Sequence, residues 1–190
     1  MQELNLVETP LRFEETLYTD LFRLKNNKTL LQTLQTSAYK RLSERSREHY
    51  AAYLDMPLGE FLFMLKEQKD AFYKSFLNPH GDKTYGAFAL ADTRVHDQKG
   101  LYFYFVDEEL KYVGRCKDAY ATRINNGYGK ISPKNCMKDG QSTNCKINAL
   151  VTYYNQSICL KLYPMEDNSK IEKLEKELIA KMQPEWNGRK

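Results

Sequence analysis

Glu175 is the first residue whose position in the sequence suggests chemistry. It lies in an expected helix from about Ser169 to Met182 and, at about 100° per residue, falls inside the apolar stripe of that helix. A carboxylate on an apolar face costs free energy unless it is paired or binds a cation. Glu175 is therefore either a metal ligand or part of a buried ion pair, with Arg123 as the expected partner. The stripe consists of Ile171, Leu174, Leu178, Ile179 and Met182.

Tyrosines are expected on one face of a β-hairpin. The runs LYFYFV (Leu101–Val106) and KYVGRC (Lys111–Cys116) are rich in aromatic and β-branched residues and flank an acidic turn. With a three-residue turn, Tyr102 lies opposite Gly114 and Tyr104 opposite Tyr112. Gly114 would then leave space above Tyr102 for a backbone or a phosphate. We expect Tyr104 to serve only in packing.

Basic side chains are concentrated just after the hairpin. From Lys111 to Lys146 there are eight basic and two acidic residues, a net charge of +6 in 36 residues. Arg123, on a short expected helix from Asp118 to Asn125, offers a planar fork of donors suited to phosphate. The segment is either a solvated basic surface or a nucleic-acid interface. The candidates for contact with DNA are Arg115, Lys117, Lys130, Lys134, Asn144 and Lys146.

The elements that must position these residues divide the chain at about residue 97. Residues 1–97 are expected to form an α-helical N-terminal region with a linker, which would serve as a recognition or dimerisation arm. Residues 98–190 are expected to form an α+β domain with a small antiparallel sheet in the order ββα-α-βα, flanked by helices. An S-x-x-E pattern at Ser169 and Glu172 predicts a capping box on the last helix. The other expected elements are helices at 11–24 (with Thr9 and Pro10 as cap and first turn), 30–34, 37–54, 57–76 and 143–155, a loop at 127–142 and a strand at 157–163.

Composition narrows the class of protein. With 190 residues, 42% of them hydrophobic, the chain is globular and too short for a large multidomain machine. It has no run of about 18 apolar residues and no secretory signal, so we expect no membrane contact and a cytoplasmic location. Four cysteines without a CxxC pair are expected to be free thiols.

Several of these residues together resemble the GIY-YIG nuclease family. GLY at Gly100–Tyr102, YVG at Tyr112–Gly114, Arg123 and LEKELIAKMQPEWN at Leu174–Asn187 occur in the family's order, over about 90 residues. The resemblance implies that Tyr102, Tyr112, Arg123, Glu175 and Asn187 form the catalytic set. Many members carry a His one turn after the motif Arg, whereas this chain has Gly127 there and Tyr128 beside it. A Tyr in place of that His is typical of restriction-type members, which adds Tyr128 to the candidates.

The resemblance also implies a reaction. Glu175 would hold one Mg²⁺ or Mn²⁺ per active site, and Tyr102, assisted by Tyr112, would activate the attacking water. Arg123, Arg115 and the metal would have to favour the phenolate, and Arg123 would neutralise the phosphate.

The expected enzyme is a site-specific restriction endonuclease that cuts double-stranded DNA as a homodimer or larger homo-oligomer. The alternatives are a homing, repair or single-strand-specific nuclease, or a non-catalytic nucleic-acid-binding module of the same fold.

Overall fold

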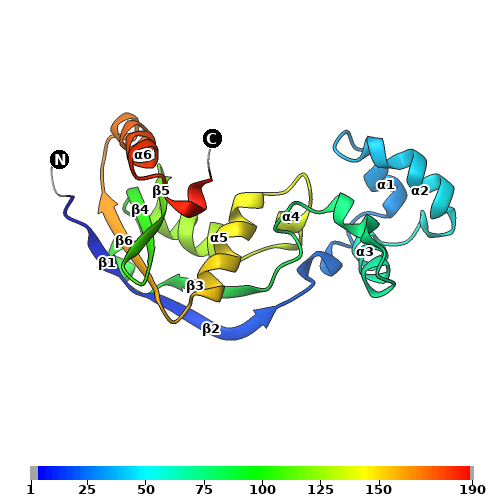
Figure 1. Ribbon diagram of the computed structural model, residues 1–190, viewed down its shortest axis with the longest axis horizontal. Coiled ribbons are helices and arrows are strands. Elements are labelled where there is room, and N and C mark those ends of the chain that lie inside the picture. Colours follow the sequence, from blue (N-terminus) through cyan, green and yellow to red (C-terminus); the bar gives the residue numbers. More distant parts are fainter. Residues whose placement is uncertain (1–3, 189–190) are drawn as a thin grey trace. The chain divides into compact units, whose positions relative to one another are not determined.

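The computed structural model of the protein describes residues 4–188 and consists of two compact units, whose elements are shown in Figure 1. Unit 1 comprises Met1–Thr16, Gly86–Lys130 and Leu150–Lys190, and unit 2 comprises Leu17–Tyr85 and Ile131–Ala149. Both units are therefore built from segments that are distant in sequence. Within residues 4–188, every helix is too short or too polar to span a bilayer.

Unit 1 is built on a four-stranded antiparallel sheet in the order β1-β6-β4-β5. Aromatic and β-branched residues dominate β4 and β5 and fit a pleated, buried surface. Helix α6 (Asn168–Met182) packs on one face of the sheet, where apolar residues from β4, β5 and α6 form a core. The strands are β1 (Val7–Thr9), β4 (Gly100–Val106), β5 (Glu109–Cys116) and β6 (Ile158–Pro164).

The hairpin of β4 and β5 has the predicted register with a different turn. Tyr102 pairs with Gly114 and Tyr104 with Tyr112, as predicted. The connecting turn has two residues, Asp107 and Glu108, rather than three, and both have positive φ (48° and 65°), as in a type I′ turn. A register shift just before Phe105 leaves one extra residue on β5. The bulge therefore offsets the shorter turn, and the tyrosines share one face.

The prediction of a helix from Leu11 to Leu24 is wrong. Leu11–Tyr18 forms strand β2, which pairs with β3 (Tyr85–Leu90), and only η1 (Leu21–Leu24) is helical. Half-buried Leu11 and Phe13 alternate with exposed neighbours, which is the period of a strand. Phe13 packs on Phe88 of β3, with 5.6 Å between ring centroids. Pairing with a segment about 70 residues away therefore decided the conformation.

Unit 2 is largely helical around an aromatic core. The short helix α1 (Leu30–Leu34) is confirmed and begins with a Thr29–Gln32 capping box. The longer helices expected at 37–54 and 57–76 are each interrupted. In the second, Lys69 has a φ of 59° and Asp70 caps the turn that follows. The other elements are η2 (Lys40–Leu42), α2 (Ser43–His49), η3 (Ala51–Tyr53), α3 (Leu58–Glu67), η4 (Ala71–Phe76) and α4 (Pro133–Cys136).

The remaining elements carry much of the candidate site. The predicted capping box at the start of α6 is wrong, because Asp167 is the N-cap and accepts hydrogen bonds from the backbone amides of Ser169 and Lys170. Helix α5 contributes residues to both units. The elements are η5 (Thr93–Val95), the π-helical η6 (Thr122–Tyr128), α5 (Ser142–Tyr153) and η7 (Glu185–Asn187).

The α+β class and the small antiparallel sheet flanked by helices are confirmed. The order ββα-α-βα is present from β4 to α6, with α4 added inside the segment expected to be a loop. The N-terminal region, by contrast, is not purely helical, since β1, β2 and β3 lie within residues 1–97. The four cysteines are free thiols, as expected.

Candidate active site

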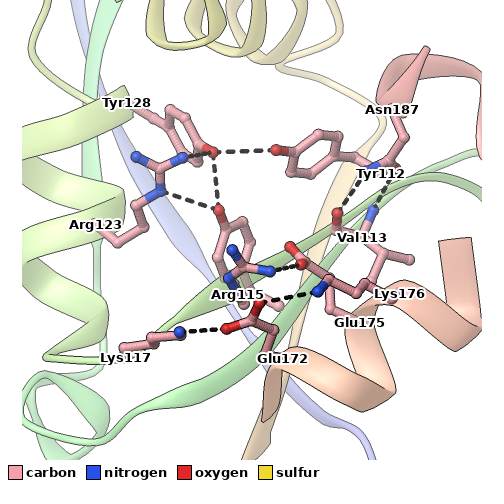
Figure 2. Close-up of polar contacts among 11 residues, drawn as sticks. Tyr112, Val113, Arg115, Lys117, Arg123, Tyr128, Glu172, Glu175, Lys176 and Asn187 are labelled. Carbon is pink, nitrogen blue, oxygen red and sulfur yellow. Dashed lines mark hydrogen bonds and ion pairs between the residues drawn. The ribbon is translucent and has the colours of Figure 1, made fainter. Parts of the chain in front are cut away.

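Four residues from β4, β5 and η6 form one hydrogen-bonded cluster, shown in Figure 2. The Tyr102 hydroxyl lies 2.8 Å from the Tyr128 hydroxyl, and the Tyr112 hydroxyl lies 3.3 Å from that same atom. Arg123 donates from Nε to Tyr102 at 3.1 Å and from Nη2 to Tyr128 at 2.6 Å. Arg123 Nη1 makes no hydrogen bond within residues 4–188. We call this group the phenol–guanidinium cluster.

Gly114 is required by the packing of Tyr102. A Cβ atom at position 114 would lie 2.3 Å from Cζ and 2.4 Å from the hydroxyl oxygen of Tyr102. The outer end of the Tyr102 ring therefore fills the space above Gly114. The expectation that this space stays open for a backbone or phosphate is wrong, because Tyr102 itself occupies it.

The π-helical turn η6 brings Arg123 and Tyr128 together. In an α-helix, two residues five apart point in directions about 140° apart. The wider turn of a π-helix, with its i→i+5 hydrogen bonds, brings these two directions much closer together. The Arg123 guanidinium carbon accordingly lies 4.4 Å from the centre of the Tyr128 ring. The helix predicted for 118–125 misses this contact, because it ends before Tyr128.

The phenols of the cluster are buried and neutral. Tyr102 and Tyr128 are fully buried, and Tyr112 is 8% exposed. Burial raises the pKa of Tyr102 well above its ordinary value of 10, and the opposing charge of Arg123 offsets only part of this rise. Burial likewise raises the pKa of Tyr128 and Tyr112. The cations of the protein alone therefore do not favour a phenolate, contrary to what the proposed role of Tyr102 requires.

Glu175 forms an ion pair with Arg115 rather than with the expected Arg123. Arg115 Nη1 lies 2.5 Å from Glu175 Oε2, and the Glu175 side chain is 15% exposed. Arg115 shares its face of β5 with Val113, which packs in the core beneath α6, so the pair lies on the α6 side of the sheet. The phenols extend from the opposite face. Both groups flank β5, the edge strand of the sheet.

The Glu175 carboxylate lies within electrostatic reach of the cluster. The pKa of Tyr112 is raised chiefly by burial, next by Tyr128, and to a smaller extent by the negative charge of Glu175. Sequence reasoning identified Arg115 as a DNA contact and as a cation that would favour the phenolate, but not as the partner of Glu175. The available signal was the alternation of side chains along β5, which places Arg115 on the face opposite to Tyr112 and therefore toward α6.

A second group of charges lies one turn from Glu175 on α6. Glu172 accepts from Lys117 at 2.5 Å and from Lys176 at 3.0 Å (Figure 2). The hydrogen bond from Lys117, followed by that from Lys176, lowers the pKa of Glu172 to about 2. Lys117, a predicted DNA contact, is thus paired with a carboxylate in this structure.

Asn187 holds the edge strand. Its Nδ2 donates to the Val113 carbonyl at 2.7 Å, and its Oδ1 accepts from the Val113 amide at 2.9 Å. Val113 directly precedes Gly114 and directly follows Tyr112. Asn187 therefore positions the strand that carries Tyr112, and both ends of its amide are engaged in doing so.

The other predicted DNA contacts belong to different parts of the chain. Lys130 is exposed at the end of a unit 1 segment, whereas Lys134, Asn144 and Lys146 belong to unit 2. Lys134 pairs with Asp139. Asn144 is only 5% exposed and donates to Gln141 at 2.6 Å. The amide of Asn144 is thus packed inside the unit, and its contact with DNA stays a prediction.

Tyr104 completes the aromatic cluster without a polar contact. Its ring centroid lies 6.2 to 6.5 Å from those of Tyr102, Tyr112 and Tyr128. Its hydroxyl is buried and has no hydrogen-bond partner within residues 4–188. This agrees with the prediction that Tyr104 serves in packing.

No group of three or more His, Cys, Asp or Glu side chains that could hold a metal occurs among residues 4–188. A partly accessible single carboxylate such as Glu175 nevertheless fits Mg²⁺, which keeps several water ligands and commonly binds one or two carboxylates plus substrate phosphate.

Comparison of this chain with protein-family models, curated proteins and solved structures finds no match.

Proposed function

We propose that unit 1 is a metal-dependent endonuclease that hydrolyses phosphodiester bonds of DNA, most like the restriction-type GIY-YIG enzymes. The observation that carries the proposal is the hydrogen bonding of the Arg123 guanidinium. Two of its nitrogens are held by buried phenols, while Nη1 has no hydrogen-bond partner in residues 4–188. A guanidinium fixed in this way can bind a phosphate without reorganising as charge develops.

Glu175 supplies the second requirement of the reaction, an oxygen ligand for a hard cation. Its present partner, Arg115, is 35% exposed and carries a charge that also suits phosphate. In the complex we expect Arg115 to turn to a DNA phosphate, and the Glu175 carboxylate would then act as a ligand of Mg²⁺ or Mn²⁺. A bound divalent cation would polarise a non-bridging oxygen and stabilise the leaving 3′ oxygen.

Tyr102, assisted by Tyr112, would orient the water that attacks phosphorus. Water forms the new P–O bond, the P–O3′ bond breaks, and the products are a 5′ phosphate and a 3′ hydroxyl. Because burial keeps Tyr102 protonated by raising its pKa, its conversion to a base requires the positive charge of the loaded site. The phenols therefore act first as the support of Arg123, and as proton carriers only in the complex with DNA and metal.

The test is cleavage of supercoiled plasmid DNA in Mg²⁺ by the full chain and two variants. Glu175→Gln removes the proposed ligand and is expected to abolish cleavage while DNA binding persists. Glu172→Gln is the matched control, since Glu172 lies on the same helix and is also paired with cations. We expect it to retain cleavage.

Retained cleavage in Glu175→Gln, or equal loss in both variants, would refute the metal role of Glu175.

A second candidate is a non-catalytic nucleic-acid-binding module. It is favoured by the closed form of the site, in which Tyr102 and Tyr128 are fully buried and Glu175 is paired with Arg115. DNA binding by the natural chain without cleavage in Mg²⁺ or Mn²⁺ would establish that alternative.

A further inference from the structure

The excess positive charge of the protein belongs to unit 2. The sequence segments of unit 2 contain 14 basic and 9 acidic residues, a net charge of +5. The segments of unit 1 contain 15 basic and 16 acidic residues, a net charge of −1. The unit with the candidate active site therefore offers no net attraction to a polyanion, whereas unit 2 does.

Within unit 2, tertiary contacts bring basic residues from separate segments together. Helix α4, which contains Lys134, packs against η1, which Lys25 directly follows. The backbone amide of Lys138 donates to the carbonyl of Phe76 at 2.8 Å. Tyr39, which directly precedes η2, stacks on Phe76 and donates to Asp139 at 2.6 Å. Residues 134–139 thus lie against the segments that carry Lys25 and Arg41.

The charges of these segments act on one another. The pKa of Lys25 is lowered first by burial, then by the positive charge of Lys134, and to a smaller extent by that of Lys28. The pKa of Lys138 is lowered first by burial and then by the positive charge of Arg41. Asp139 offsets part of this charge near Lys25. The fold therefore holds like charges close together, at a cost in free energy that a bound anion would relieve.

We infer that Lys25, Lys28, Arg41, Lys134 and Lys138 form a basic surface that binds the sugar-phosphate backbone of double-stranded DNA. Lys28, Arg41 and Lys134 are exposed, and the other two are half-buried. The inference deepens the proposed action on DNA and rests on it for the choice of polyanion. Binding of this kind fixes the position of a duplex and provides affinity without reading bases. Unit 2 would thus supply an affinity for DNA that the net charge of unit 1 does not provide.

The inference is tested by DNA binding in EDTA, where no metal-dependent cleavage occurs. The full chain with Lys25, Lys28, Arg41 and Lys138 all changed to Gln is titrated against a fluorescent 20-base-pair duplex from 50 to 300 mM salt. Lys134 is kept because it pairs with Asp139. At about 100 mM salt we expect affinity to fall at least about tenfold, and the slope of log K against log salt to fall by roughly one unit for each phosphate that the variant no longer neutralises.

Two controls make the result specific. A variant with Arg12, Lys99, Lys170 and Lys173 of unit 1 changed to Gln loses the same charge and is expected to bind nearly as the natural chain does. A variant with Lys25→Arg, Lys28→Arg, Arg41→Lys and Lys138→Arg keeps the charge and is expected to keep the affinity. Thermal unfolding of each variant verifies that it is folded.

Unchanged binding in the unit 2 Gln variant, equal loss in the unit 1 control, or no binding of duplex DNA by the natural chain would overturn the inference. Binding to single-stranded RNA or to an acidic protein in preference to duplex DNA would also overturn it. If the natural chain binds DNA through this surface but cleaves nothing in Mg²⁺ or Mn²⁺, the basic surface stands and the nuclease proposal fails.

Discussion

Tyr102 and Tyr104 offer a matched test of the phenol–guanidinium cluster. Both side chains are fully buried on the same face of β4, and each can be shortened by one oxygen through Tyr→Phe. The Tyr102 hydroxyl contacts both Arg123 Nε and the Tyr128 hydroxyl, whereas the Tyr104 hydroxyl has no partner within residues 4–188. The same chemical change should therefore have different consequences at the two positions.

The magnitude follows from the hydrogen bonds that each substitution removes. Tyr102→Phe leaves Arg123 Nε, a charged donor, without a partner, while Tyr128 retains its contacts with Arg123 and Tyr112. A buried donor left unpaired costs about 1–3 kcal/mol, and more when it is charged, so we expect unit 1 to lose about 2–3 kcal/mol of unfolding free energy. Tyr104→Phe removes an unpaired buried oxygen and should be within about 0.5 kcal/mol of the natural chain or slightly more stable.

Urea unfolding monitored by tryptophan fluorescence measures this difference. Trp186 is the only tryptophan, lies buried in unit 1 and stacks on Tyr154, so its emission reports on this unit. Unfolding free energies are compared at a common slope with denaturant. Equal losses in the two variants, or a larger loss in Tyr104→Phe, would refute the assigned hydrogen bonds.

Three further predictions concern the same unit. Gly114→Ala forces a methyl group into the Tyr102 ring and should lower the free energy of unfolding by about 1–3 kcal/mol. Gly127→Ala is the control, because its new Cβ meets nothing closer than 3.6 Å and should not destabilise the unit. Urea unfolding compares the two variants. Asn187→Ala removes two hydrogen bonds to Val113 and should lower stability by about 1–2 kcal/mol, with faster amide exchange along β5; unchanged exchange there would contradict the proposed clamp. The pKa of Glu172 is lowered from 4.5 to about 2. The contribution of its ion pairs to stability is therefore present above pH 4.5 and is lost as the pH falls toward 2. Between these two pH values, the unfolding temperature of Glu172→Gln should depend less on pH than that of the natural chain.

The sequence by itself determined the elements with strong local signals. The aromatic runs of β4 and β5 specify strands, and the alternation within β4 places Tyr102 and Tyr104 on one face. Tyr112 shares that face because the bulge before Phe105 offsets the shorter turn. The apolar stripe of α6 placed Glu175 at the margin of the core, where it is 15% exposed. These features depend on neighbours within one element, so periodicity is enough to find them.

Tertiary structure decided the features that depend on distant partners. Leu11–Tyr18 carries apolar residues compatible with two periods and became a strand because β3 pairs with it. Glu175 required a buried counter-charge, and the facing of β5 supplied Arg115 rather than Arg123. The π-helical turn that stacks Arg123 on Tyr128 also has no local signature in the sequence.

The positive charge of the protein also illustrates what the sequence determines and what the tertiary structure decides. The sequence determined that cations are abundant between residues 111 and 146, but the fold assigned residues 131–149 to the unit that also holds Lys25 and Arg41. Periodicity acts over a few residues, whereas electrostatic and packing partners are chosen by the path of the whole chain. The residue types available for chemistry were therefore readable from the sequence, and only the folded chain decided which of them meet.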